Sequence, residues 1–198
     1  MGILGGIIVL IVVLVVILVI LIGLYNSIIS IRNKVENAWS QIDVQLRKRY
    51  DLIPNLVETV KGYAAHERET LEKVIAARKM GMDASNVKDQ SQAENMISST
   101  LKTLFAVSEN YPNLKADTHF TRLMEELNGI ENNISFARQF YNDMVMQFNT
   151  RIQTFPGNVF AGMFNFKIKD YFEIESPEMR EPVKVQFTEP IVKSNEEK

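Results

Sequence analysis

The chain has 198 residues, a formal net charge of −2 at pH 7 and no cysteine. Positive and negative charges are mixed along it, which gives no electrostatic reason to expect nucleic-acid binding. The missing cysteines exclude disulfides, thiolate metal sites, a cysteine nucleophile and a lipid-modified cysteine.

The first predicted element is a membrane-spanning helix over residues 3–24, which contain only Ile, Leu, Val and Gly. About 22 residues make a helix of roughly 33 Å, enough to cross a hydrocarbon core of about 30 Å. A cleaved secretory signal would instead show a charged leader, a shorter apolar core and a small-residue cleavage site. We therefore expect a retained anchor over residues 1–27. Its membrane-spanning residues include Ile3, Gly6, Leu14 and Leu24.

Basic residues follow this span, and the amino side carries only the terminal amine. They are Arg32, Lys34, Arg47, Lys48 and Arg49. By the positive-inside rule, the body should lie in the cytoplasm and the short amino end outside. This predicts a single-pass protein of the inner or plasma membrane.

The span is expected to continue without a joint into the first helix of the body. Apolar residues recur mostly in steps of three and four from Ile28 to Val60, as in an amphipathic helix. Pro54 lies inside this pattern, and we expect it to kink or restart the helix because it has no N–H. A continuous helix would couple packing in the body to the tilt of the span.

Three more helices are predicted, at about residues 64–78, 90–109 and 117–154. Residues 81–86 form a predicted turn, because they combine Gly, Asp, Ser and Asn. The last helix carries the apolar spacing of a left-handed bundle seam. The predicted fold class is all-α: a transmembrane helix that continues into an up-and-down antiparallel bundle of about four long helices, over residues 28–158, with an extended C-terminal tail.

An aromatic, amphipathic segment follows at residues 159–175, with two interpretations. It covers the open end of the bundle, or it lies in the membrane headgroup region or against a second copy. The residues for that second contact are Phe160, Met163, Phe164, Phe166, Lys167 and Lys169. The tail, residues 176–198, is extended or disordered, and its alternation from Val183 to Phe187 is typical of a strand that a partner captures.

Two motif blocks are the most specific feature of the chain. NAWSQIDVQL at residues 37–46 and RYDLIPNLVETVKGYA at residues 49–64 form the first; Ala137-Arg138, Tyr141-Asn142 and FPGN at residues 155–158 belong to the second. They resemble the LemA family of bacterial membrane-anchored proteins. The resemblance implies a single-span anchor with a helical bundle and no assigned reaction. Some members are linked to shaping or organising membranes, including those of magnetosomes.

No catalytic or metal-binding motif is identified. Tyr63 and Ala116 stand three residues before the two histidines, so the Glu-x-x-His pair of di-metal bundles is absent. Thr70 occupies the place where a zinc-protease string starting at His66 needs its second histidine. Phosphate-binding glycine loops and G-x-S-x-G turns are also missing. We expect a protein that is not an enzyme and has no cofactor.

Polar residues are mixed into the stripes of the two long helices. They form either a solvated face or a buried polar and ionic ladder that fixes register and partner choice. The ladder would comprise Arg49, Asp51, Asn55, Arg138 and Asn142.

Two functional hypotheses follow. The first is a membrane-anchored helical scaffold that forms a homo-oligomer and organises or remodels the membrane; Gly2 and Gly6 give the span a weak close-packing motif. The alternative is a membrane-tethered adaptor or receptor that presents a bundle surface or its C-terminal strand to a protein partner.

Overall fold

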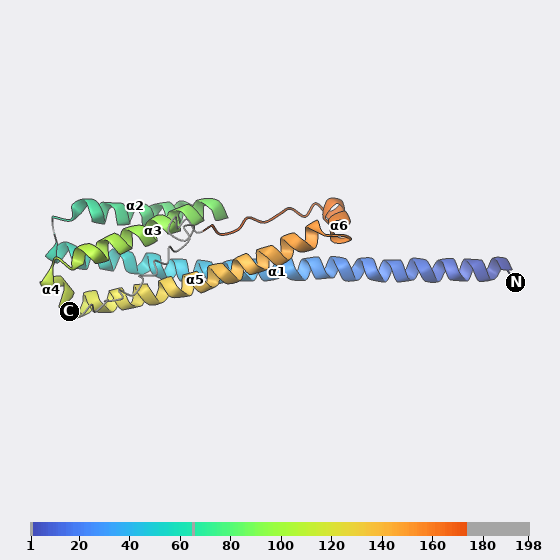
Figure 1. Cartoon of the computed structure of the whole chain (residues 1–198), viewed down its shortest axis with the longest axis horizontal. Coiled ribbons are helices and arrows are strands. Elements are labelled where there is room, and N and C mark those ends of the chain that lie inside the picture. Colours follow the sequence, from blue (N-terminus) through green and yellow to red (C-terminus); the bar gives the residue numbers. More distant parts are fainter. Residues whose placement is uncertain (1, 65, 174–198) are drawn as a thin grey trace, which may run out of the picture.

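The computed structural model describes residues 2–64 and 66–173, and within these ranges every regular element is a helix (Figure 1). The helices are α1 (Gly2–Tyr63), α2 (Arg68–Asp83), α3 (Val87–Ser108), α4 (Pro112–Lys115), α5 (Thr118–Gln153) and α6 (Gly157–Phe164). The all-α prediction is confirmed. The tail predicted at residues 176–198, with Val183 to Phe187, lies outside the described residues.

Helix α1 joins the apolar stretch to the body as one helix of 62 residues. Its side chains from Leu4 to Gly23 are all exposed, and its first buried residue is Ile28. The amino-terminal part therefore projects beyond the bundle without covering from the rest of the chain (Figure 1). It is the one helix among the described residues that is long and apolar enough to cross a membrane.

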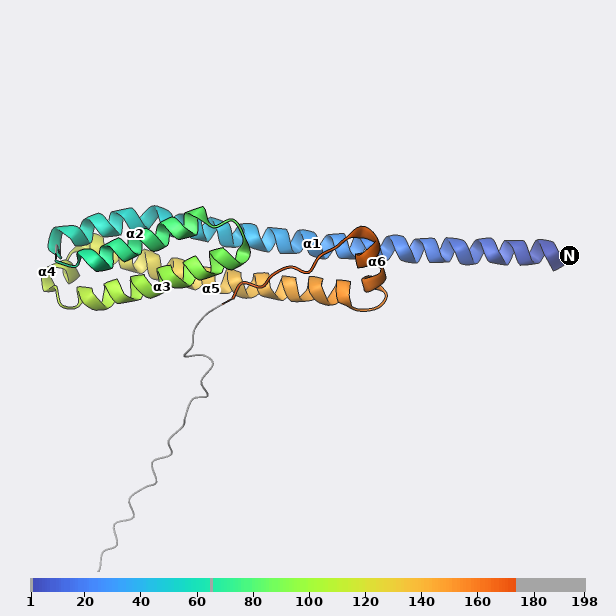
Figure 2. The same ribbon diagram turned by 90° about the horizontal axis from the view of Figure 1, so that it is seen from above.

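The body is an up-and-down bundle in which α1, α2, α3 and α5 alternate in direction (Figures 1 and 2). Helix α1 packs mainly on α5, and α2 packs mainly on α3. Because α2 and α3 have 16 and 22 residues against 36 in α5, they cover only the part of the α1/α5 pair that lies away from the span (Figure 2). The four-helix core thus ends before the exposed apolar stretch of α1 begins.

Helix α1 continues through Pro54, so of the two sequence-based expectations the restart is wrong. In a regular helix the N–H of residue 54 would donate to the carbonyl of Tyr50. Here Nε of Arg78, on α2, donates to that carbonyl oxygen at 2.8 Å. A neighbouring helix therefore supplies the donor that proline lacks.

The turn predicted at residues 81–86 is also wrong in its position, because α2 continues to Asp83. Gly81 lies inside the helix, where a Cβ would come within 2.5 Å of the Tyr50 hydroxyl oxygen. Its glycine serves close helix packing instead of a turn. The short helix α4 was not predicted, and the boundary placed between residues 158 and 159 falls inside α6.

After α6 the chain returns along the bundle as an extended segment, residues 165–173, which we call the strap (Figure 2). Asn165, with φ of 54°, ends α6 in the left-handed region and turns the chain. The strap runs over the half of the α1/α5 pair that α2 and α3 leave uncovered (Figure 2). The strap part of the aromatic segment therefore lies along the α1/α5 pair.

Candidate functional site

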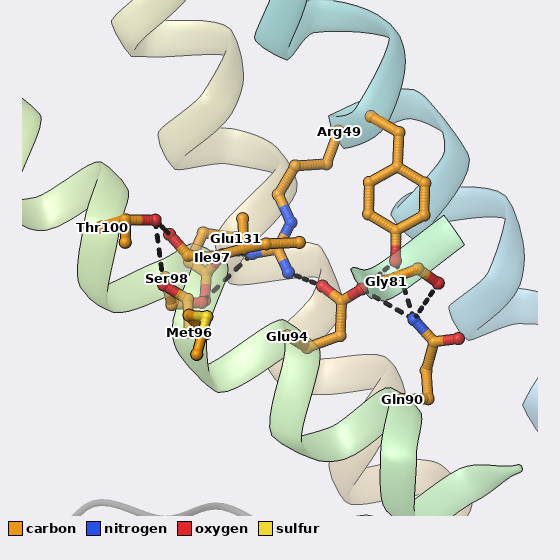
Figure 3. A network of polar contacts seen from close by, with 10 residues as sticks. Arg49, Gly81, Gln90, Glu94, Met96, Ile97, Ser98, Thr100 and Glu131 are labelled. Carbon is orange, nitrogen blue, oxygen red and sulfur yellow. Dashed lines mark hydrogen bonds and ion pairs between the residues drawn. The ribbon is translucent and has the colours of Figure 1, made fainter. Parts of the chain in front are cut away.

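A buried ionic network ties the long helices together in the four-helix part of the bundle (Figure 3). Arg49 of α1 pairs with Glu94 of α3 and with Glu131 of α5. The side chains of Arg49 and Glu94 are both 0% exposed. Ser98 accepts a hydrogen bond from Nη1 of Arg49 at 3.1 Å and donates to Oε1 of Glu131 at 2.7 Å. Both charges of the fully buried pair are thus compensated.

The second oxygen of Glu94 is held by neutral groups. Tyr50 donates its hydroxyl hydrogen to it, and Nε2 of Gln90 lies 2.8 Å away. The same Gln90 nitrogen lies 2.7 Å from the Tyr50 oxygen and 3.2 Å from the carbonyl oxygen of Gly81. The network therefore includes α2 as well (Figure 3).

Burial shifts the pKa values of two groups in this network, Arg49 and Tyr50. Burial lowers the pKa of Arg49 to about 10, against the opposing effect of the Glu131 carboxylate. Burial raises the pKa of the Tyr50 hydroxyl above its ordinary value. A groove of about 570 Å³ lies beside Tyr50 and Gln90. Because the buried Glu94 carboxylate is already paired with Arg49, the network has the character of a structural ion pair more than of an acid–base site.

The predicted polar ladder is only partly buried. Arg49 and Arg138 lie in the interior, whereas Asp51 and Asn55 are exposed on α1. Two residues along a helix turn through about 200°, so Asp51 must point away from the side that buries Arg49. Asn142 is half-buried and forms hydrogen bonds with the strap. Of the five residues predicted for the ladder, only Arg49 and Arg138 are therefore buried.

Glu94 and Gln90 were missed by the sequence-based reasoning. They lie one turn apart on α3 and are followed by Ile97 and Leu101 on the same buried stripe. A charged residue in phase with apolar residues is the signal that points to them. Their partners on α1 and α5 are not visible from that pattern.

Arg138 has a different environment from Arg49. Its guanidinium lies over the ring of Phe172 in the strap, 4.6 Å from the ring centroid. Among the described residues, no hydrogen-bond acceptor reaches its Nε or Nη2. Burial lowers its pKa below the ordinary value for arginine. The guanidinium of Arg138 therefore makes a cation–π interaction with Phe172.

Two asparagines of α5 hold the strap through its backbone. Nδ2 of Asn142 donates to the Phe172 carbonyl at 3.0 Å, and Oδ1 accepts from the Phe172 N–H at 2.8 Å. Asn149 makes the same pair of bonds with Lys169, at 2.9 Å each. Tyr141 donates to the carbonyl of Asp170 at 3.0 Å.

Phe172 is the buried side chain of the strap. Its ring lies 6.2 Å from that of Trp39, which in turn meets Tyr141 edge-on at 5.5 Å. Burial, together with the charge of Asp170, raises the pKa of Tyr141 to about 12. Arg138 completes this pocket over the ring face. We call the surface of α1 and α5 that holds the strap the strap groove. Its residues are Trp39, Arg138, Tyr141, Asn142 and Asn149.

Helix α6 lies beside the point where the apolar stretch of α1 ends. The ring of Phe164 is 4.8 Å from that of Tyr25, and Nη2 of Arg151 donates to Oγ of Ser27 at 2.7 Å. Of the six residues predicted for membrane or oligomer contact, Met163, Phe164 and Lys167 are exposed, Phe166 and Lys169 are half-buried, and Phe160 is buried. Val159 and Met163 leave an apolar surface at this level, Met163 being 73% exposed.

A second apolar surface lies on the side of the α1/α5 pair within the bundle. A groove of about 500 Å³ there is lined by Gln41, Val44, Gln45, Asn133, Phe136, Ala137 and Phe140. None of these residues is charged, and Phe136 is 71% exposed. Grooves elsewhere on the bundle are lined in part by charged residues, such as Arg47 and Asp51 or Lys102 and Glu131. We call this surface the neutral groove.

Within residues 2–64 and 66–173, no group of three or more His, Asp or Glu side chains gathers where it could hold a metal ion.

Comparison with known protein sequences finds relatives of this chain. The model of the LemA family matches residues 38–187. The chain is 27% identical over 158 residues to Protein LemA of Metamycoplasma hominis, covering 78% of this chain and 72% of that protein. It is 23% identical to Magnetosome protein MamQ 2 of Paramagnetospirillum magneticum and 22% to Magnetosome protein MamQ of Magnetospirillum gryphiswaldense, covering 80% of this chain and 68% of each relative. None of these names states an enzymatic activity.

Proposed function

This chain belongs to the LemA family, and we propose that it is a membrane-anchored helical scaffold that self-associates and organises or remodels the bilayer around it. The continuity of α1 is the observation that carries this proposal. One unbroken helix contains both the exposed apolar stretch and a large part of the bundle core. A contact between two bundles would therefore act directly on the tilt and spacing of their spans.

The position of α6 supports a second contact with lipid. Tyr25 marks the end of the apolar stretch, and the exposed Met163 and Phe164 lie at that level. An apolar surface of this kind is suited to the boundary between headgroups and acyl chains. The scaffold would thus touch the bilayer through α6 as well as through its span.

The neutral groove supports self-association. Identical copies repel each other through any like charges that they bring face to face, and this groove brings none. Val44, Phe136 and Phe140 provide exposed apolar area for the contact. Anchoring in one membrane also holds all copies at the same height, so equivalent surfaces face each other.

We further propose a single-pass topology in the inner or plasma membrane, with the body in the cytoplasm. Arg32 and Lys34 follow the apolar stretch and favour this orientation. The scaffold role needs neither a cofactor nor a catalytic group.

The mass and shape of the full-length chain in nanodiscs or mild detergent test the proposal. We expect a regular assembly of several copies, and Phe136→Asp combined with Phe140→Asp should reduce its mass because charges then face each other across the neutral groove. Met82→Asp, at a position that is 56% exposed on α2, serves as the matched control and should leave the assembly intact. A wild-type chain that stays monomeric at all concentrations contradicts the scaffold.

The alternative function is a membrane-tethered adaptor, and the neutral groove is also the observation that favours it. Exposed aromatic side chains around an uncharged groove can hold an apolar helix of another protein. A monomer that co-purifies with one partner in a fixed ratio, and loses it with the Phe136→Asp and Phe140→Asp double variant, would support the adaptor.

A further inference from the structure

We propose that the strap groove is a binding site for an extended peptide that carries a phenylalanine, and that the strap of a second copy occupies it in exchange for the chain's own strap. The proposal rests on the self-association proposed above and names one means by which neighbouring copies are linked. A contact through equivalent neutral grooves pairs two copies, and an assembly larger than a pair needs another interface.

The spacing of the two asparagines matches that of an extended backbone. Asn142 and Asn149 are seven residues apart on α5, which is about 10.5 Å along the helix. Lys169 and Phe172 are three residues apart in the strap, about 10 Å when extended. Each asparagine amide therefore meets the N–H and the C=O of one peptide residue. These hydrogen bonds recognise the peptide backbone and do not select for particular side chains.

Selectivity comes from the aromatic pocket. Trp39 lies beside Phe172 and in turn contacts Tyr141, and the Arg138 cation lies over the face of Phe172. An aliphatic side chain would lose that cation–π contact, so Arg138 favours an aromatic residue there. Nζ of Lys169 lies 3.7 Å from a carboxylate oxygen of Glu36, which adds a preference for a basic residue three positions earlier. The ligand class is therefore an extended Lys-x-x-Phe segment.

The strap is attached in a way that permits exchange. Among the described residues, the hydrogen bonds between positions 167–173 and the helices all use a side chain of the bundle, with no backbone–backbone bond. They include bonds from Ser91 and Asn95 of α3 to the Glu173 carbonyl. An identical segment from another copy can make every one of them.

The membrane arrangement fits the same exchange. The strap enters its groove next to α6 and runs away from the span (Figure 2). Copies anchored side by side hold their grooves at the same height above the membrane. The strap of every copy then runs away from the membrane. Phe172 lies seven residues beyond Asn165, so an extended strap reaches about 23 Å from that turn. This reach is enough for the pocket of a bundle packed alongside.

Two full-length variants in nanodiscs test the exchange by complementation. The receiver carries Phe172→Ala and keeps its groove, and the donor carries Asn142→Ala with Asn149→Ala and keeps its strap. Both also carry the Phe136→Asp and Phe140→Asp changes, so that the neutral groove does not join them. We expect each variant alone to be monomeric and the mixture to form one-to-one pairs, measured by native mass and by pull-down with a tag on one variant.

A synthetic peptide with the sequence of residues 165–173, fluorescently labelled, tests the groove itself. We expect it to bind the receiver, and its counterpart with alanine in place of Phe172 to bind about tenfold more weakly or worse. Circular dichroism and thermal melting show that the receiver is folded. A folded receiver that ignores the peptide overturns the groove as a peptide site.

The remaining outcomes separate the two proposals. If the peptide binds and the wild-type chain assembles, but donor and receiver do not pair, the exchange between copies is wrong and the scaffold stands. If the wild-type chain itself is monomeric, the scaffold is wrong, and the exchange that depends on it falls with it.

Discussion

At the scale of single residues, the two buried arginines have different roles although both lie on the inner faces of long helices. Arg49 is surrounded by carboxylates from two other helices. Arg138 lies over an aromatic ring of the strap instead. A buried charge is costly to leave alone, so the consequence of removing an arginine depends on what stays behind.

Arg49→Met and Arg138→Met should therefore differ in their effect on stability. Arg49→Met leaves Glu94 buried without its cation, and we expect a loss of roughly 3–5 kcal/mol in the free energy of unfolding. Arg138→Met removes a cation–π contact and keeps an apolar side chain over Phe172, so a loss of about 1 kcal/mol is expected. Urea unfolding followed by circular dichroism measures both values.

The matched control for the first variant is Arg49→Met combined with Glu94→Leu. Because it removes both charges of the pair, it should recover most of the stability that the single variant loses. Equal losses for Arg49→Met and Arg138→Met would contradict the separate roles assigned to these residues.

At the scale of elements, the continuity of α1 depends on another helix. Pro54 removes the hydrogen bond that the Tyr50 carbonyl would accept within α1, and Arg78 of α2 replaces it. Gly81, on the same helix, allows the Tyr50 side chain to approach closely. Packing of α2 therefore stabilises α1 at Pro54.

A double-mutant cycle between Pro54 and Arg78 tests this dependence. Arg78→Met leaves the Tyr50 carbonyl without a donor, and we expect a loss of about 1–3 kcal/mol in unfolding free energy. Pro54→Ala restores a backbone N–H, so the same Arg78→Met change should cost clearly less in that background. Chemical unfolding of the four proteins gives the coupling energy, and strict additivity would contradict the proposed compensation.

At the scale of the whole molecule, the chain combines a long helix, a bundle that covers part of it, and a return segment that fills the remainder. Helix α6 stands where the bundle ends and the exposed apolar stretch begins (Figures 1 and 2). In a membrane this position corresponds to the bilayer surface, because about 30 Å of hydrocarbon accommodates the apolar stretch up to its end.

The depth of α6 can be measured because the chain contains no cysteine. We expect a fluorophore attached at Met163→Cys in the full-length protein to be quenched by lipids that carry a quencher just below the headgroups. The same fluorophore at Met82→Cys, on α2, should not be quenched and is the control. If both positions are quenched equally little, α6 does not contact the bilayer.

Much of the architecture follows from local patterns. The unbroken apolar stretch at residues 3–24 determines a candidate span, and steps of three and four determine the helices, because a helix side repeats every 3.6 residues. The two motif blocks identified the LemA family, which the family comparison confirms. The helix predicted to end at about residue 109 ends at Ser108, because Asn110 and Pro112 follow it and their conformational preferences act locally.

Only the tertiary structure decided which polar side chains are buried and what they contact. Arg49 and Asp51 are close in sequence, but only Arg49 points toward α3 and α5. The donor that replaces the missing N–H of Pro54 comes from 28 residues along the chain from Tyr50, and Lys169 is held by Asn149 across a return of the chain. Helix formation depends on near neighbours in sequence, whereas these contacts depend on how distant segments approach each other. Local periodicity therefore determined the elements, and their packing determined the site.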